Sequence, residues 1–150
     1  MTISWLVSLF ERDLDRLKKE IELYSDEKIF WKTEKGIANS AGNLSLHLIG
    51  NLSHFIGATL GKNDYVRDRE KEFSDKNIAK SEILLKLAVV RDTVSDVLQN
   101  LDEKDLIQTF PINVWGEEID TGYFLIHLAT HLNYHLGQIN YHRRLLDVGT

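Results

Sequence analysis

The sequence contains no cysteine among its 150 residues, only one proline and one methionine. The lack of cysteine excludes disulfides, thiolate nucleophiles and Cys-ligated zinc or iron-sulfur sites, so His, Asp and Glu are the possible metal ligands. The single proline, Pro111, and the lack of sustained two-residue alternation favour helices over strands. We therefore expect an all-α protein in which imidazole groups contribute to any metal site.

An excess of positive charge is also lacking, because 18 basic and 23 acidic residues give a formal net charge of -5. The charges are spread along the chain, so neither nucleic acid nor an anionic membrane surface is expected as a partner. The apolar run before Glu11 has no basic lead and is too short for a signal peptide core or a membrane span. We expect one cytoplasmic domain over residues 1–150, which is long enough to bury a core.

Four segments show the three- and four-residue apolar spacing of amphipathic helices, over about 2–25, 43–60, 80–100 and 121–147. The second segment is apolar nearly all round, so it is either central or partly covered by another subunit. It also carries a stripe of small residues, Gly50, Ser53 and Gly57, which lets a neighbouring helix approach closely. Asp120 or Thr121 can cap the fourth segment.

Three connectors separate these segments. Residues 25–42 include Phe30 and Trp31, whose rings are expected to cover the core. Residues 61–77 are charged and show no steady period, so we predict a connector rather than a helix, and a crossover of this length suits parallel helices on either side. In residues 102–120, β-branched and aromatic residues flank Trp115 and Gly116, which predicts a small hairpin before the last helix.

Four of the six histidines fall in the last segment: His127, His131, His135 and His142. On a helical wheel at 100° per residue they lie within about 80° of one another, on the face that also carries Phe124, so they are expected to point inward. Residues four apart are neighbours, so His131 can share one ion with either His135 or His127. One ion cannot easily take all three, because His127 and His135 are about 12 Å apart along the axis.

A catalytic three-histidine site needs a third ligand, and the other histidines are His47 and His54, both on the inward face of the second segment. They are about 10.5 Å apart along the helix and cannot serve one ion together, so spacing alone leaves both possible. The ordinary alternative for an inward histidine is a hydrogen-bonded core residue. Di-iron carboxylate bundles are excluded because no acidic residue stands three positions before any histidine, and zincins because Leu132 follows His131.

Several motifs follow one another along the chain: Asn43-Leu-Ser-Leu-His47-Leu-Ile-Gly-Asn51-Leu, Arg67-Asp-Arg-Glu-Lys-Glu-Phe73, Lys80-Ser-Glu-Ile-Leu-Leu, Leu101-Asp-Glu-Lys-Asp-Leu106 and His131-Leu-Asn-Tyr-His135-Leu-Gly-Gln-Ile139. Through them the sequence resembles the DinB-like (YfiT-like) metal-binding four-helix bundles, and in particular the DUF1572 branch. The resemblance implies an up-down-down-up bundle with a long crossover between the second and third helices. It also implies a divalent metal held by His47, His131 and His135.

Three neutral imidazoles suit Zn²⁺ or Ni²⁺ best, with the remaining positions open to water or substrate. His54 and His127 then belong to the surroundings of the site. Asn51 and Gln138 are about one turn beyond ligands, where they can hydrogen-bond the ligands or line a pocket. We identify no carboxylate on the inward faces beside the three histidines, and therefore no general base.

The leading hypothesis is a metal-dependent enzyme that activates a water or a low-molecular-weight thiol for attack on an electrophilic small molecule. The resemblance implies a thiol S-transferase or a hydrolase. The first alternative is a non-catalytic, stress-related bundle whose structural metal takes a fourth ligand such as His127. A weaker alternative is non-covalent haem between two histidines. A homodimer is expected from the apolar surplus of the second segment and from the resemblance.

Overall fold

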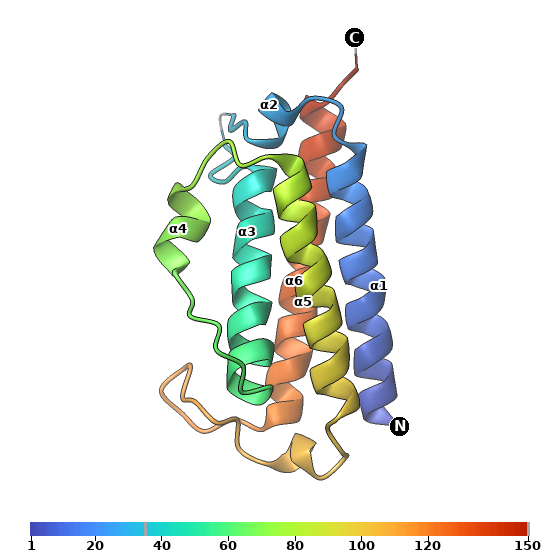
Figure 1. Ribbon diagram of the computed structural model, residues 1–150, viewed down its shortest axis with the longest axis vertical. Helices are drawn as coiled ribbons and strands as arrows, with labels where there is room; N and C mark the ends of the chain where they lie inside the picture. Colours follow the sequence, from blue (N-terminus) through green and yellow to red (C-terminus); the bar gives the residue numbers. More distant parts are fainter. Residues whose placement is uncertain (35, 150) are drawn as a thin grey trace.

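The computed structural model describes residues 1–34 and 36–149, and within them the secondary structure is helical with no strand. Four long rods pack side by side: α1 (Thr2–Leu23), α3 (Ala41–Leu52) continued by η1 (Ser53–Leu60), α5 (Lys80–Gln99) and α6 (Thr121–Leu146) (Figure 1). In Figure 1, α1 and α6 run upward, whereas α3 and α5 run downward. The segment between η1 and α5 returns outside the bundle. None of the described helices is long and apolar enough to cross a membrane.

The apolar stripe of α1 faces both α5 and α6. Its buried residues follow the helical repeat, at Leu6, Phe10, Leu14, Leu17 and Ile21. The helix ends at Leu23, two residues before the predicted boundary, because the backbone of the next residue, a tyrosine, is extended. The predicted helix is therefore confirmed, with its apolar face in the core.

Helix α3 is buried along its whole length, because α4 (Arg69–Ser74), α5 and α6 all pack against it. The Ser40 hydroxyl accepts a hydrogen bond from the Asn43 N–H, so the helix begins two residues earlier than predicted. Beyond Leu52 the chain continues as the π-helix η1, which the sequence pattern did not indicate. Since its own chain covers α3, the apolar surplus of this helix does not require a second subunit.

Two of the predicted connectors contain short α-helices. Residues 61–77 include α4, whose first turn is capped by Asp68 accepting from the Lys71 N–H. Residues 25–42 include α2 (Glu27–Phe30), followed by the buried ring of Trp31. The interpretation of residues 61–77 as a connector without a helix was therefore wrong. A helix of fewer than two turns is too short to show a period in the sequence.

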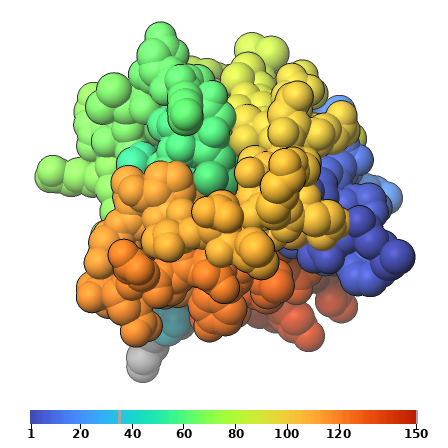
Figure 2. All heavy atoms as spheres, turned by 90° about the horizontal axis from the view of Figure 1, so that it is seen from below, coloured from blue at the N-terminus to red at the C-terminus, as the bar shows by residue number. Residues whose placement is uncertain are grey.

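The predicted hairpin is reduced to an isolated antiparallel bridge between Thr109 and Asp120. The Phe110 N–H donates to the Ile119 carbonyl at 2.8 Å, and no strand extends from it in the part of the chain that the structure describes. Pro111 follows at once and cannot donate to a ladder. The segment between α5 and α6, which includes η2 (Asp105–Ile107), spreads in yellow and orange across the lower end of the bundle (Figure 2).

Candidate metal centre

Three histidines from two neighbouring helices form one cluster, with His47 on α3 and His131 and His135 on α6. One ring nitrogen of each lies within 4.8 Å of the other two, and the Nε2 atoms of His47 and His131 are 3.1 Å apart. A tetrahedral ion with nitrogen ligands at about 2.0–2.1 Å holds those nitrogens roughly 3.3–3.4 Å apart. The cluster therefore has the size of a three-histidine metal site, and it can hold a metal ion.

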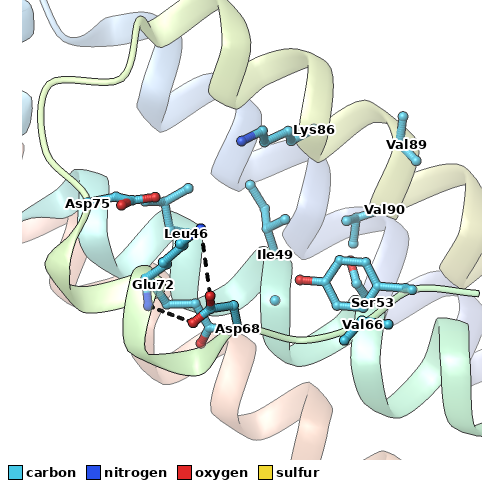
Figure 3. A pocket seen from close by; sticks show the side chains of 13 residues that line it. Leu46, Ile49, Ser53, Val66, Asp68, Glu72, Asp75, Lys86, Val89 and Val90 are labelled. Atoms are coloured by element: carbon cyan, nitrogen blue, oxygen red, sulfur yellow. Dashed lines mark hydrogen bonds and ion pairs between the residues drawn. The ribbon is translucent and has the colours of Figure 1, made fainter.

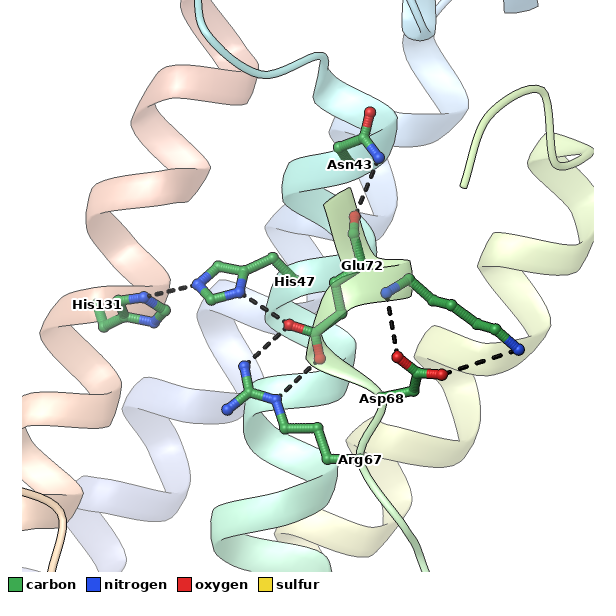
Figure 4. A network of polar contacts seen from close by, with 7 residues as sticks. Asn43, His47, Arg67, Asp68, Glu72 and His131 are labelled. Atoms are coloured by element: carbon green, nitrogen blue, oxygen red, sulfur yellow. Dashed lines mark hydrogen bonds and ion pairs between the residues drawn. The ribbon is translucent and has the colours of Figure 1, made fainter. Parts of the chain in front are cut away.

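Glu72 of α4 fixes the orientation of His47. Its Oε1 accepts from His47 Nδ1 at 3.0 Å, and Arg67 donates from Nε to Oε2 at 2.8 Å and from Nη2 to Oε1 at 2.9 Å (Figure 4). Because a carboxylate only accepts, Nδ1 carries the ring proton, and the Nε2 lone pair of His47 is free for a metal. Burial alone would raise the pKa of Glu72, but the hydrogen bonds from His47 and Arg67 outweigh it and hold that pKa below its ordinary value.

The approach of α4 to α3 depends on two residues of α3. The Asn43 amide donates from Nδ2 to the backbone carbonyls of Glu72 at 3.0 Å and Asp75 at 2.9 Å. At Gly50, a Cβ atom would lie only 2.0 Å from Glu72 Oε2. The stripe of small residues predicted to admit a neighbouring helix thus admits a buried carboxylate at this position.

The expectation that no carboxylate lies beside the histidines was wrong, because Glu72 and Arg67 reach the site from the crossover. Both belong to the motif Arg67–Phe73, in which the charges alternate in sign from residue to residue and no apolar spacing marks a buried face. Of the acidic residues in that motif, Glu72 is buried whereas Asp68 and Glu70 are exposed. Only the packing of α4 on α3 decides which of them points inward, so the local sequence gave no indication of the buried one.

Burial favours the neutral imidazole at both His131 and His135. Burial lowers the pKa of His131 to about 4, with further lowering by the neighbouring His135 and His47. Burial likewise lowers the pKa of His135, partly offset by the hydrogen bond from its Nδ1 to Gln138 Oε1 at 2.6 Å. Since an amide oxygen accepts, that bond leaves the Nε2 lone pair of His135 free. Gln138 is therefore a hydrogen-bond partner of a candidate ligand.

Buried polar atoms without partners gather around the same cluster. Among the residues that the structure describes, His131 Nδ1 and Asn51 Oδ1 are the buried side-chain polar atoms that have no hydrogen-bond partner. Asn51 is one helical turn beyond His47 on α3. Buried polar groups normally find partners, so unpaired ones at this location are typical of a binding site.

The other histidines stand outside the cluster. The His127 ring stacks on Phe124 at 5.7 Å between centroids and lies 6.1 Å from that of His131. The His54 ring packs against Phe55, and burial lowers the pKa of both His54 and His127. Neither of these two histidines contributes a nitrogen to the converging group.

His142 has a structural role, because partners occupy both of its ring nitrogens. Nε2 donates to the Lys32 carbonyl at 2.8 Å, and Nδ1 accepts from the Tyr24 hydroxyl at 2.7 Å. The side chain is buried where α6 meets the end of α1. It is the hydrogen-bonded core histidine that the ordinary reading of the sequence describes.

Comparison with known proteins identifies the family. A family model described as "Protein of unknown function (DUF1572)" matches residues 3–149. The crystal structure of a DinB-like protein from Bacillus cereus superposes with a TM-score of 0.69 over 88% of this chain and 84% of that chain, at 19% sequence identity. A search of curated proteins returned no match. The chain therefore belongs to the DUF1572 family and has the DinB-like fold.

Proposed function

We propose that residues 1–150 form one domain with the activity of a divalent-metal-dependent enzyme, in which His47, His131 and His135 hold Zn²⁺ or Ni²⁺. The observation that carries the proposal is the convergence of three imidazole nitrogens, two of which, on His47 and His135, have lone pairs left free by the hydrogen bonds at Nδ1. Three protein ligands leave positions for water or substrate, as catalytic zinc sites do, whereas structural sites are usually closed by four. Thiol S-transfer or hydrolysis of an electrophilic small molecule suits such a site.

When bound, the metal would supply Lewis-acid chemistry, lowering the pKa of a water or a low-molecular-weight thiol at its open position. The chain's own residues prepare the site for it. Glu72 keeps the proton of His47 on Nδ1, and Gln138 does the same for His135. Because burial keeps His131 uncharged at neutral pH, binding does not have to displace a proton from its ring.

The alternative is a non-catalytic bundle with a structural metal. A variant at His127 distinguishes this alternative from the enzyme. A closed site needs a fourth ligand, and His127 is the nearest further histidine on α6, with its ring centroid 6.1 Å from that of His131. Rotation of that ring toward the cluster would close the site. The variant His127→Ala therefore keeps the metal in the enzyme and loses it in the structural alternative.

A homodimer remains part of the proposal, on different grounds from those in the sequence. Trp5 and Leu9 of α1 and Ile126 of α6 are exposed apolar residues, and Leu9 and Ile126 line the same surface hollow. A second copy that packs on this face would remove them from water. Sedimentation of a purely monomeric species at micromolar concentration would contradict this.

Metal analysis of untagged protein supplied with zinc or nickel tests the proposal. We expect about one equivalent in the wild type and in His127→Ala, and a large loss in His47→Ala and His131→Ala. Turnover is then measured with a panel of thiols and electrophiles and with activated esters, using the His131→Ala protein as the matched blank. A wild type that retains no metal, or a metal-loaded protein without turnover on either panel, would contradict the enzyme.

A further inference from the structure

A cavity of about 450 Å³ adjoins the candidate metal centre at His135. One side consists of residues 36–39 and Leu44 of α3, and the other of α6 residues that include His135 and Gln138. This volume lies in the range of small-molecule sites, about 300–1,000 Å³. A molecule held here would have one end beside a ring that the proposed function assigns to the metal.

The α6 wall carries a stripe of mostly apolar side chains that lies outside the buried core of the bundle. Tyr134, Gln138, Tyr141 and Leu145 stand at intervals of four, three and four residues, which places them on one face of the helix. Tyr134 and Leu145 share the histidine face of the helical wheel, yet both are 64% exposed, and Tyr141 is 63% exposed. The core face of α6 is a separate set of buried residues. The stripe is therefore large apolar surface that borders a cavity instead of the core.

The polar groups of the cavity are few and uncharged. Gln138 accepts from His135 and donates from Nε2 to the Tyr134 hydroxyl at 3.2 Å, so a short hydrogen-bonded chain runs along the wall from the candidate ligand. The two nitrogens of His142 are already bonded, which leaves its ring as a flat surface. Asn39 supplies an amide on the opposite side.

No Asp, Glu, Lys or Arg occurs among the described residues that line this cavity. By contrast, a cavity of about 380 Å³ between α3, α4 and α5 is lined by charged as well as apolar residues, and the charged ones include Asp68, Glu72, Asp75 and Lys86 (Figure 3). An ion withdrawn from water without a partner of opposite charge is strongly disfavoured. The lining itself therefore offers no partner to an anion or a cation, and in the protein without metal it favours an uncharged ligand.

We propose that the cavity beside His135 binds an uncharged, largely apolar molecule with a planar or aromatic group, and that this molecule is the electrophile of the proposed reaction. The planar group lies against the rings of Tyr134 and Tyr141, and a polar substituent reaches the Gln138 amide. An anionic or zwitterionic thiol would then have to reach the centre from another side. The role as a substrate site rests on the proposed function, whereas the selection for an uncharged ligand does not.

Three ligands of nearly equal size and different charge test the selection: benzamide, benzoate and benzylammonium. Each is titrated into the protein of residues 1–150, as purified and after chelator treatment, while amide NMR signals are recorded. We expect benzamide to shift the signals of Leu44, Tyr141 and Leu145 saturably in both preparations, and in the chelator-treated protein to bind at least tenfold tighter than either ion. Equal binding of an ion by the chelator-treated protein, or shifts elsewhere on the surface, would overturn the proposal.

A second test places a charge at the edge of the cavity. Leu145→Lys is expected to weaken benzamide binding and to strengthen benzoate binding at least threefold, whereas Leu85→Lys, exposed on α5, should change neither. If the same signals instead move on dilution and sedimentation shows a dimer that Leu145→Lys disrupts, the stripe is a contact between copies and the proposal is wrong. Because the chelator-treated protein is titrated as well, these results can still be interpreted if metal binding or turnover fails.

Discussion

Replacement of Glu72 by glutamine tests whether this carboxylate orients the metal site. The side chain is 6% exposed and accepts three hydrogen bonds, one from His47 and two from Arg67. Glutamine has the same shape, but its amide nitrogen donates, so one of its ends must face a donor of His47 or Arg67. His47 then loses the group that keeps its proton on Nδ1.

The expected effect on metal binding follows from similar carboxylate–histidine pairs in metalloproteins. Loss of such a partner weakens metal affinity by roughly 10–100-fold, which is about 1.4–2.7 kcal/mol. Folding stability should fall as well, by about 3 kcal/mol, because the largely buried Arg67 side chain loses its counter-ion. The two effects are separable, since affinity is measured under conditions in which the variant is fully folded by circular dichroism.

Competition with a chromophoric chelator measures the affinity, and Glu70→Gln is the matched control because Glu70 is exposed on the same short helix. Gly50→Ala gives an independent perturbation. Its new methyl group would lie 2.0 Å from Glu72 Oε2 and must displace the carboxylate, although every hydrogen-bonding group is retained. A Glu72→Gln protein that binds metal within threefold of the wild type, while His131→Ala loses it, would refute the orienting role.

Three further predictions concern the rest of the bundle. Tyr24→Phe removes the buried hydroxyl that bonds His142 Nδ1, and should lower the unfolding free energy in urea by about 1–3 kcal/mol without changing metal content. Arg143 and Asn140 hold the pKa of Glu20 below its ordinary value against the opposing effect of burial, so the folded carboxyl takes up a proton less readily than the unfolded one. The stabilisation from Glu20 is therefore complete above its ordinary pKa and is lost as the pH falls through its lower folded value; Glu20→Gln should flatten that part of the acid unfolding profile. Leu17→Ala, at a position with 0% exposure, should cost about 2–5 kcal/mol in urea denaturation, whereas the exposed Leu85→Ala should stay within about 0.5 kcal/mol.

Local periodicity determined where the long helices lie, because in a helix of five or more turns the buried apolar residues recur in the sequence at a regular spacing. The predicted segments 80–100 and 121–147 each end within one residue of α5 and α6. The same spacing places His131 and His135 next to each other on one face of the helix. Their partner did not follow from it, since spacing left His47 and His54 equally possible and only the resemblance chose between them.

Tertiary structure decided the features that depend on two segments at once. The chain changes to a π-helix at Ser53, so a wheel drawn at 100° per residue misplaces the residues of η1 by an angle that grows toward Leu60. Whether Glu72 points at His47 is set by the packing of α4 on α3 and by the missing Cβ of Gly50. The sequence by itself determined which faces are apolar and which histidines share a helix. Only the folded chain brought a carboxylate from the crossover to the histidine of another helix, because that contact joins residues 25 positions apart.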